Sequence, residues 1–183
     1  MNGEVPALFV RRVLASCVEE FFDAHGMACE IIQEGAELPP ADHVELGSIV
    51  GFRGNGVRGG LAFVAPLELI GELLPVPKSI EHVDAQMRDW SAEIANQLVG
   101  RLKNKLSARS VNFHVGSPVC FTGKAIRFVF LPDAEGMSLC FRASSSSVHV
   151  HLECSLALGE EDAADPADPN DVRIVPEGEM LFF

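Results

Sequence analysis

Residues 79–107 read SIEHVDAQMRDWSAEIANQLVGRLKNKLS and form the longest amphipathic pattern in the chain. Apolar residues recur every three or four positions, as they do on one face of a helix with about 3.6 residues per turn. The pattern predicts one helix that begins at Ser79 or Val83 and ends at Ser107. We expect its apolar face to pack on a sheet. That face carries Met87, Trp90, Ile94, Leu98 and Leu102.

A second amphipathic helix is predicted upstream, over residues 6–25. Pro6 suits a first helical turn, and Gly26 suits a helix end. Between the two helices the pattern is typical of strands, and the dipeptide Asn55-Gly56 favours a tight hairpin turn. The predicted elements are a strand at 27–34, a loop at 34–46, a hairpin of 48–52 and 61–64, and a short helix at 67–74.

Four more strands are predicted after the long helix, at 111–121, 125–131, 137–143 and 148–158. A helix followed by antiparallel strands therefore occurs twice along the chain. This weak internal duplication predicts an α+β fold in which two long helices lie on one face of an antiparallel sheet.

The charge of the chain is concentrated at one end. The 183 residues have a formal net charge of −12, and residues 159–183, with eight acidic residues and one basic residue, account for −7 of it. We expect residues 1–158 to form one folded domain, and residues 159–183, rich in Pro, Asp and Ala, to be a disordered tail. Nucleic acid and anionic membranes attract broad basic faces, so neither is expected as a partner.

The lengths of the apolar runs and the number of cysteines exclude further classes of protein. No apolar run approaches the roughly 20 residues of a membrane-spanning helix, and no basic segment precedes the first apolar stretch as in a signal peptide. The five cysteines are an odd set without a C-x-x-C pair, so neither a disulfide framework nor a structural zinc site is expected. We expect free thiols, most of them buried, in a cytoplasmic protein.

Polar residues form a second stripe on the long helix, opposite its apolar face. Asp89, Glu93, Asn96, Gly100 and Lys103 are spaced so that all five share this face. Such a stripe is often no more than the solvated side of a helix. A shuffled chain of this composition contains E-x-x-N about 0.6 times. With Asp or Ser also required four residues earlier, and Gly four residues after the Asn, the expected number falls below about 0.01. Glycine inside a helix costs about 1 kcal/mol relative to alanine, which suggests that something approaches the backbone at Gly100.

This pattern resembles a known family. Asp89-x3-Glu93-x2-Asn96, then Gly100-x2-Lys103-x2-Leu106 and Ser117-Pro118-x4-Gly123, is similar to the motif of the CheC/CheX/FliY phosphatases of bacterial chemotaxis. Twenty-one residues separate Asn96 from Pro118, close to the spacing in that family. The resemblance covers residues 6–158 and implies a CheX-like phosphatase domain that removes phosphate from the aspartyl phosphate of a CheY-like response regulator.

The resemblance also implies roles for these residues. An acyl phosphate is already activated, so the catalyst has only to place a water in line with the P–O bond. Asn96, as an amide that donates and accepts hydrogen bonds, would position that water, and Glu93 would pair with a lysine beside the phosphosite and dock the regulator. Supporting roles fall to Asp89, Gly100, Lys103 and Pro118. Mg²⁺ is expected on the regulator, and no cofactor or metal on this chain.

The branch of the family follows from the first helix. It contains Glu19, Glu20 and Asp23 but no asparagine, whereas CheC-type proteins have an acid–amide pair on both long helices. A single site indicates the CheX-like branch, whose members commonly form homodimers through β-sheet contacts. A homodimer is therefore expected.

Three further patterns have competing interpretations. The glycine-rich residues 54–60 favour a hairpin turn over a phosphate-binding loop, since no Gly-Lys-Ser/Thr ending follows. His149 and His151 alternate with apolar residues, which favours a strand with one solvent-exposed face over a metal site. Such a strand would either pair across a dimer edge or use its polar residues to block that pairing. The basic residues at 101, 105 and 109 are interpreted as solvated surface rather than as a contact for an acidic regulator or for the tail.

The sequence thus predicts a phosphatase, with a non-catalytic module as the alternative. Such a module would bind a receiver through the same stripe, or act as a dimeric scaffold in a chemosensory assembly. Binding of a phosphorylated receiver without faster dephosphorylation would distinguish the module from the enzyme.

Overall fold

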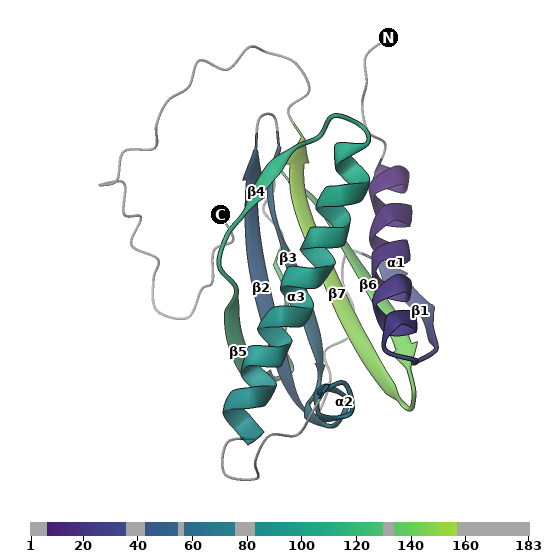
Figure 1. The fold of residues 1–183 in the computed structure, drawn as a ribbon, viewed down its shortest axis with the longest axis vertical. Coiled ribbons are helices and arrows are strands. Elements are labelled where there is room, and N and C mark those ends of the chain that lie inside the picture. Colours follow the sequence, from purple (N-terminus) through teal and green to yellow (C-terminus); the bar gives the residue numbers. More distant parts are fainter. Residues whose placement is uncertain (1–6, 36–42, 55–56, 76–82, 130–133, 157–183) are drawn as a thin grey trace, which may run out of the picture.

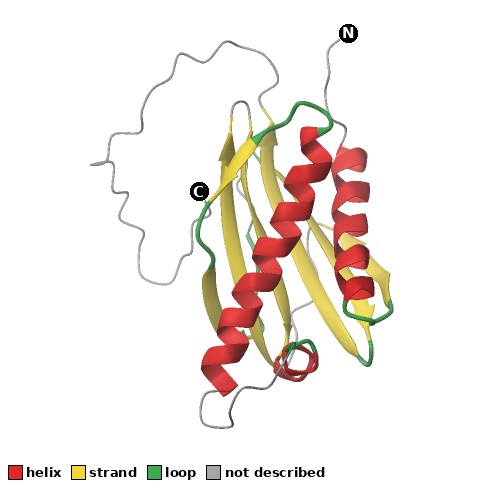
Figure 2. Cartoon of the chain, viewed as in Figure 1, coloured by secondary structure: helices red, strands yellow, loops and turns green. Residues whose placement is uncertain are grey.

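In the part of the chain that the structure describes, two long helices lie side by side on one face of a single antiparallel sheet of seven strands (Figure 1). The computed structural model describes residues 7–35, 43–54, 57–75, 83–129 and 134–156. Figure 2 shows both helices in red in front of the yellow sheet. The predicted α+β class is confirmed.

The helices are α1 (Ala7–Ala24), α2 (Leu67–Glu72) and α3 (Val83–Ser107). The strands are β1 (Cys29–Gly35), β2 (Val44–Gly54), β3 (Val57–Pro66), β4 (Phe113–Val115), β5 (Val119–Lys124), β6 (Glu135–Ala143) and β7 (Ser146–Leu156).

The sheet order reflects the internal duplication. The strands lie in the order β1-β6-β7-β3-β2-β4, with β5 also paired to β2. The first unit runs α1, β1, β2, β3, and the second runs α3, β4 with β5, β6, β7. The last strands of the two units, β3 and β7, pair at the centre, and the first strand of each unit pairs with the second strand of the other. The two units therefore complete one sheet by exchanging edge strands, which buries one core between the sheet and both helices.

The core lies between this sheet and the apolar faces of α1 and α3. Met87, Ile94, Leu98 and Leu102 of α3 are buried, as the helical spacing predicts, while Trp90 is half-buried. The largest fully buried side chains include Phe21 and Phe22 of α1, Phe63 of β3 and Phe141 of β6. Burying a side chain of this size stabilises a fold by roughly 1.5–3 kcal/mol, so these aromatic residues contribute much of the helix–sheet attachment.

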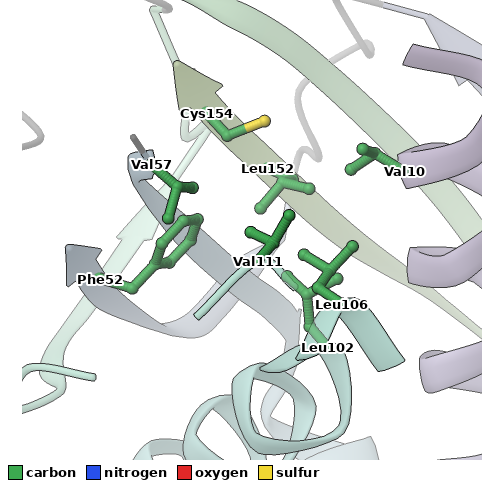
Figure 3. Close-up of a pocket in the computed structure, with 8 residues that line it drawn as sticks. All are labelled: Val10, Phe52, Val57, Leu102, Leu106, Val111, Leu152 and Cys154. Carbon is green, nitrogen blue, oxygen red and sulfur yellow. The ribbon is translucent and has the colours of Figure 1, made fainter. Parts of the chain in front are cut away.

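A small void lies in the core beneath the C-terminal end of α3 (Figure 3). Its volume is about 10 Å³. All its lining side chains are apolar or a thiol, so it is a dry packing gap and not a ligand site. They are Val10, Phe52, Val57, Leu102, Leu106, Val111, Leu152 and Cys154.

Most of the predicted elements are confirmed. Both long helices, the β2–β3 hairpin, the short helix after Pro66, and the strands at 27–34, 137–143 and 148–158 occur with shifts of a few residues. The loop predicted at 34–46 is shorter than expected, because Glu34 and Gly35 belong to β1 and residues 44–46 to β2. The Asn55-Gly56 turn, Ser79 and the tail at 159–183 lie outside the described residues.

The single strand predicted at 111–121 is wrong, because the segment is divided into β4 and β5. Between the pairs Phe52–Val115 and Ile49–Val119, β2 advances three residues and the opposing chain four. Pro118 lies in this gap and has no N–H with which to continue the ladder. The backbone N–H of Gly116 instead donates to the carbonyl oxygen of Gly51 at 2.8 Å.

The strand predicted at 125–131 is also wrong over its described residues, 125–129. Ala125 has a φ of 52°, which turns the chain out of the extended conformation directly after β5. The chain then meets the sheet face opposite the helices, where the Phe128 ring stacks on His151 with 4.0 Å between centroids. Here β5 already occupies the edge of β2 that this segment would have needed.

The expectation that one face of β7 is wet is overturned as well. β7 is an inner strand between β3 and β6, so it neither forms nor blocks a dimer edge. His151 is 7% exposed and Glu153 is 5% exposed. His151 Nδ1 lies 2.7 Å from Ser138 Oγ of β6, a buried hydrogen bond. Alternating polar residues therefore mark a polar buried layer here, because side chains also cover the second face of the sheet.

Candidate functional site on helix α3

Buried polar contacts fix the N-terminal half of α3 on the sheet. Ser91 Oγ lies 2.8 Å from Ser48 Oγ of β2, and Ser48 Oγ also lies 3.1 Å from Cys120 Sγ of β5. The Cys120 thiol donates to the backbone carbonyl of Arg88 at 3.3 Å. These contacts set the rotation of α3, because they hold the Ser91 side of the helix against the sheet. Sequence analysis missed them: a serine within the apolar stripe is visible, but its partners are distant in sequence.

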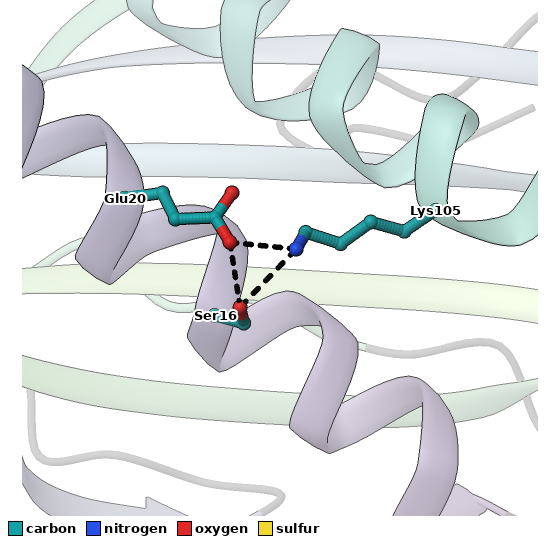
Figure 4. A network of polar contacts seen from close by, with 3 residues as sticks. All are labelled: Ser16, Glu20 and Lys105. Carbon is teal, nitrogen blue, oxygen red and sulfur yellow. Dashed lines mark hydrogen bonds and ion pairs between the residues drawn. The ribbon is translucent and has the colours of Figure 1, made fainter.

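Contacts with α1 hold another side of α3 (Figure 4). Lys105 Nζ donates to Glu20 Oε1 at 2.6 Å and to Ser16 Oγ at 3.3 Å. The Arg101 guanidinium lies 5.5 Å from the centre of the Phe21 ring. Cation–π contacts of this kind contribute about 0.5–1 kcal/mol at exposed positions. The helix–helix boundary is therefore largely ionic and aromatic.

These contacts correct one interpretation made from the sequence. The basic residues at 101, 105 and 109 do not form a merely solvated line. Arg101 and Lys105 contact α1 as described, and the Arg109 guanidinium lies 4.6 Å from the centre of the Phe9 ring. A position facing solvent on an isolated helix becomes a contact when a second helix packs beside it. The sequence pattern of α3 alone contains no signal of that neighbour.

The third side of α3, opposite the sheet, carries all five residues of the polar stripe. Asp89 and Glu93 are exposed, while Asn96, Gly100 and Lys103 are half-buried. With about 100° per residue, these positions lie on the side opposite Ser91, Leu98 and Leu102, which face the core. The structure thus brings the five residues predicted for α3 onto one surface, which we call the α3 outer face.

Asn96 and Glu93 differ in their hydrogen bonding. Glu93 Oε1 accepts a hydrogen bond from Gln97 Nε2 at 2.9 Å, one turn further along the helix. The Asn96 amide makes no hydrogen bond to any other described residue of the chain. The carboxylate is thereby held on the outer face, while the donor and acceptor of the amide are not taken up by any described residue.

Gly100 leaves the outer face open. A Cβ built at this position would meet nothing within 4 Å. No described neighbour therefore requires glycine here, although glycine costs a helix interior about 1 kcal/mol relative to alanine. Open space beside Asn96 is the room that an approaching macromolecule needs.

Pro118 lies away from the helix itself, at the sheet edge between β4 and β5, where it is half-buried. This edge runs beside the N-terminal half of α3, because Cys120 of β5 contacts the Arg88 backbone. The other glycine of the pattern, Gly123, packs near Ile126, whose Cγ1 atom would lie 3.3 Å from a Cβ at that position. Pro118 and Gly123 therefore shape the edge strand beside α3.

The described residues contain no other obvious reactive centre. No group of three or more His, Cys, Asp and Glu side chains among them is arranged to hold a metal ion. The thiols of Cys17, Cys140 and Cys154 are buried, and burial raises their pKa values, to about 12 for Cys17 and about 11 for Cys154. Cys29 and Cys120 are half-buried, and burial raises the pKa of Cys29 to about 12. Thiols with raised pKa values are poor nucleophiles at neutral pH.

A comparison with protein families agrees with this surface. The model of the family described as chemotaxis phosphatase CheX matches residues 46–142, more than half of the chain. The chain belongs to the CheX family of chemotaxis phosphatases. No curated protein sequence matches it.

Solved structures show the CheX-like fold. The chemotaxis protein CheX from Vibrio vulnificus superposes with a TM-score of 0.66 at 17% identity, covering 84% of this chain and 100% of that one. CheX from Desulfovibrio desulfuricans gives 0.64 at 13% identity, covering 78% and 97%. CheX in the CheX–CheY–BeF3–Mg²⁺ complex from Borrelia burgdorferi gives 0.57 at 15% identity, covering 80% and 95%. At these identities the likeness is one of fold.

Helix α1 of this CheX-family chain has no counterpart of the Glu93–Asn96 pair. Glu20 is bound to Lys105 and Ser16, and Glu19 and Asp23 are exposed without an asparagine beside them. The acid–amide arrangement within the described residues is thus on α3.

The structure shows where the glycine-rich stretch and the two histidines of the sequence lie. Gly54 and residues 57–60 of the glycine-rich stretch belong to β2 and β3. A Cβ at Gly59 would lie 2.8 Å from the Phe52 ring, so that glycine permits close packing. His149 and His151 lie in the sheet with ring centres 6.2 Å apart, and burial lowers both pKa values, that of His151 to about 3.

Within the described residues, no helix is long and apolar enough to cross a membrane.

Proposed function

We propose that this CheX-family protein hydrolyses the aspartyl phosphate of a CheY-like response regulator, in chemotaxis or a related two-component pathway. One observation carries the proposal. Asn96 lies on the open outer face of α3, one turn from Glu93, with an amide that binds no other described residue. An asparagine in that state is suited to holding a water against a bound partner.

The proposed chemistry needs no nucleophile from this chain. A water attacks phosphorus, the bond between phosphorus and the aspartyl oxygen breaks, and inorganic phosphate and the regulator's carboxylate are formed. The Asn96 amide accepts a hydrogen bond from the water and so orients an oxygen lone pair toward phosphorus. Positioning of this kind supplies much of the catalysis when the leaving group is already activated.

Glu93 has a different part in the proposal. Its carboxylate is exposed and held by Gln97, so it is available at a defined place on the outer face. An ammonium group beside the regulator's phosphosite would pair with it and fix the docking register. Asp89, Lys103, Gly100 and Pro118 support this contact through the charge and shape of the surface around it.

The fold neighbour from Borrelia burgdorferi that was solved with CheY, BeF3 and Mg²⁺ supports a CheY-like partner. We assign the Mg²⁺ of the reaction to the regulator rather than to this chain. We also propose that the protein acts in the cytoplasm, where response regulators are phosphorylated.

The decisive experiment measures the loss of phosphate from receivers of the same organism. Each receiver is phosphorylated with a small-molecule donor in the presence of Mg²⁺, and inorganic phosphate is followed with and without this protein. We expect faster release from a cognate receiver with the wild-type chain and a loss of the acceleration with Asn96→Ala. Asn104→Ala is the matched control, since Asn104 is an exposed asparagine on the same helix. Full activity of Asn96→Ala would overturn the proposal.

The same experiment separates the enzyme from a non-catalytic module. A module would bind the phosphorylated receiver, measured by titration calorimetry, without changing the rate of phosphate release. A scaffold would show neither effect, and changing Glu93 and Asn96 together would leave it unaltered.

We propose that the protein is a homodimer, as the family resemblance implies. β1 and the β4–β5 pair form the edges of the described sheet, and each carries an exposed apolar residue, Ile32 at 40% and Val119 at 60%. Light scattering coupled to gel filtration gives the molar mass. A mass of one 19.7 kDa chain at micromolar concentration would exclude the dimer.

A further inference from the structure

Basic side chains form a row across the sheet face opposite the helices. Arg53 of β2 pairs directly with Arg58 of β3 on one side and with His114 of β4 on the other. Arg58 in turn pairs with Ser155 of β7. Directly paired residues of antiparallel strands point to the same face, so all four side chains share it. We call Arg53, Arg58 and His114 the basic row.

The basic row faces away from the core. Phe52, the residue before Arg53, lines the void beneath α3, and successive side chains of a strand point to opposite faces. Arg53, Arg58 and His114 are all exposed. The row and the α3 outer face are thus on opposite sides of the molecule.

No acidic side chain among the described residues pairs with these arginines. The ion pairs formed by described residues are Arg11–Glu34, Lys105–Glu20 and Arg142–Glu30. Glu153, two residues before Ser155 on β7, is 5% exposed and takes part in an interaction of its own. Like charges directly opposite on a sheet destabilise it, so the row attracts an anion.

The described part of β7 ends beside this row, and an anionic segment follows it in the sequence. β7 ends at Leu156, which pairs with Val57, the residue before Arg58 (Figure 1). Glu160, Glu161 and Asp162 follow within six residues. Five residues reach at most about 17 Å, whereas Ser155 and Arg53 are two strand spacings, or about 10 Å, apart.

We propose that Glu160, Glu161 and Asp162 of the acidic tail bind the basic row of their own chain. Tethering places these carboxylates at a high effective concentration beside the arginines, which favours pairs too weak to form between separate molecules. Guanidinium groups suit this contact because each forms bidentate hydrogen bonds with a carboxylate. The beginning of the tail is held on the sheet face opposite the α3 outer face, and the α3 surface stays open. This inference does not depend on the phosphatase proposal.

Nuclear magnetic resonance on the full-length, ¹⁵N-labelled chain tests the contact. The readouts are the amide shifts and the heteronuclear NOE of residues 160–162. We expect ordered-backbone NOE values at about 0.01 M salt and their loss at about 1 M, where the Debye length falls from about 30 Å to about 3 Å. The double variant Arg53→Glu, Arg58→Glu should lose the order at low salt. Adding Glu160→Arg, Glu161→Arg and Asp162→Arg to that variant should restore it.

A matched control changes the same charge elsewhere. Arg12→Glu with Arg88→Glu alters two exposed arginines on the helix side of the molecule and should leave the tail signals unchanged. The inference is overturned if residues 160–162 have the NOE of a free chain in the wild type, or if the two double variants behave alike. Order that disappears on dilution would also overturn it, because the tail would then be bound to a second copy.

Discussion

Lys105 on α3 donates a hydrogen bond to Glu20 on α1 across 2.6 Å, and this pair joins the two long helices. Glu20 is thereby occupied by a structural contact, whereas Glu93 lies on the outer face of α3 with only Gln97 attached. Glu20 therefore attaches one helix to the other, whereas the Glu93 carboxylate lies on the protein surface.

Glu20→Gln should lower stability without affecting phosphate release. The hydrogen bond from Lys105 lowers the pKa of Glu20, so the pair stabilises the fold above the ordinary pKa of a glutamate and is lost as pH falls through the lowered value. Both side chains are about a third to a half exposed, so solvent screening keeps the contribution within about 0.2–1 kcal/mol. Urea unfolding of Glu20→Gln, Lys105→Met and the double variant measures the coupling, and additive effects would contradict the pairing.

Gly47→Ala should destabilise the fold. A Cβ at Gly47 would overlap the Phe121 ring, which lies across this position of β2 from β5. Overpacking of this kind costs about 1–3 kcal/mol, seen as a lower urea midpoint. Phe121→Leu in the Gly47→Ala background should recover part of the loss. Gly71→Ala, where nothing lies within 4 Å of the new Cβ, is the control, and an equal loss there would refute the steric explanation.

Gly100 substitutions should separate stability from function. Gly100→Ala is expected to raise the unfolding free energy by up to about 1 kcal/mol, because the helix gains propensity and the new Cβ meets nothing. Gly100→Gln should also form a stable helix but slow receiver dephosphorylation, since its side chain fills the open space beside Asn96. Asn104→Gln introduces the same side chain one turn further along. If Gly100→Gln dephosphorylates the receiver as fast as wild type, the open surface has no role in docking.

His151 should make the protein sensitive to acid. Burial, and to a lesser extent His149, lowers the pKa of His151 to about 3, so the folded chain keeps it neutral while the unfolded chain protonates it near pH 6.5. Between these values the unfolded state binds one proton more, and the unfolding free energy falls by about 1.4 kcal/mol for each unit that pH decreases. His151→Asn, which preserves a hydrogen-bonding group for Ser138, should remove this contribution to the slope.

The measurement is urea unfolding at several pH values between about 4 and 6.5, the window in which His151 of the unfolded chain gains its proton. His149 has the same sign of shift, so some slope should remain in the variant. Asn104→Ala provides the control, because it changes an exposed side chain without a titratable group and should leave the slope as it is in wild type. An unchanged slope in His151→Asn would show that this side chain is not the source.

Local patterns were sufficient for the long elements. The period of Met87, Ile94, Leu98 and Leu102 predicts α3 and its buried face because helical geometry is set by nearby residues. The edge strand was predicted poorly. Pro118 and the positive φ of Ala125 interrupt it, and a sequence pattern of apolar residues does not indicate which strand already occupies the edge of β2.

Local sequence patterns are enough to predict the class of fold, the CheX resemblance and the five residues that share one side of α3. Periodicity and motif spacing are properties of the chain, independent of what packs beside it. The three-dimensional packing was needed to show that Arg101 and Lys105 bind α1, that His151 is buried, and that Arg53 and Arg58 lie side by side near the end of β7. Those outcomes depend on burial and on strand register, which join residues far apart in sequence and leave no local trace.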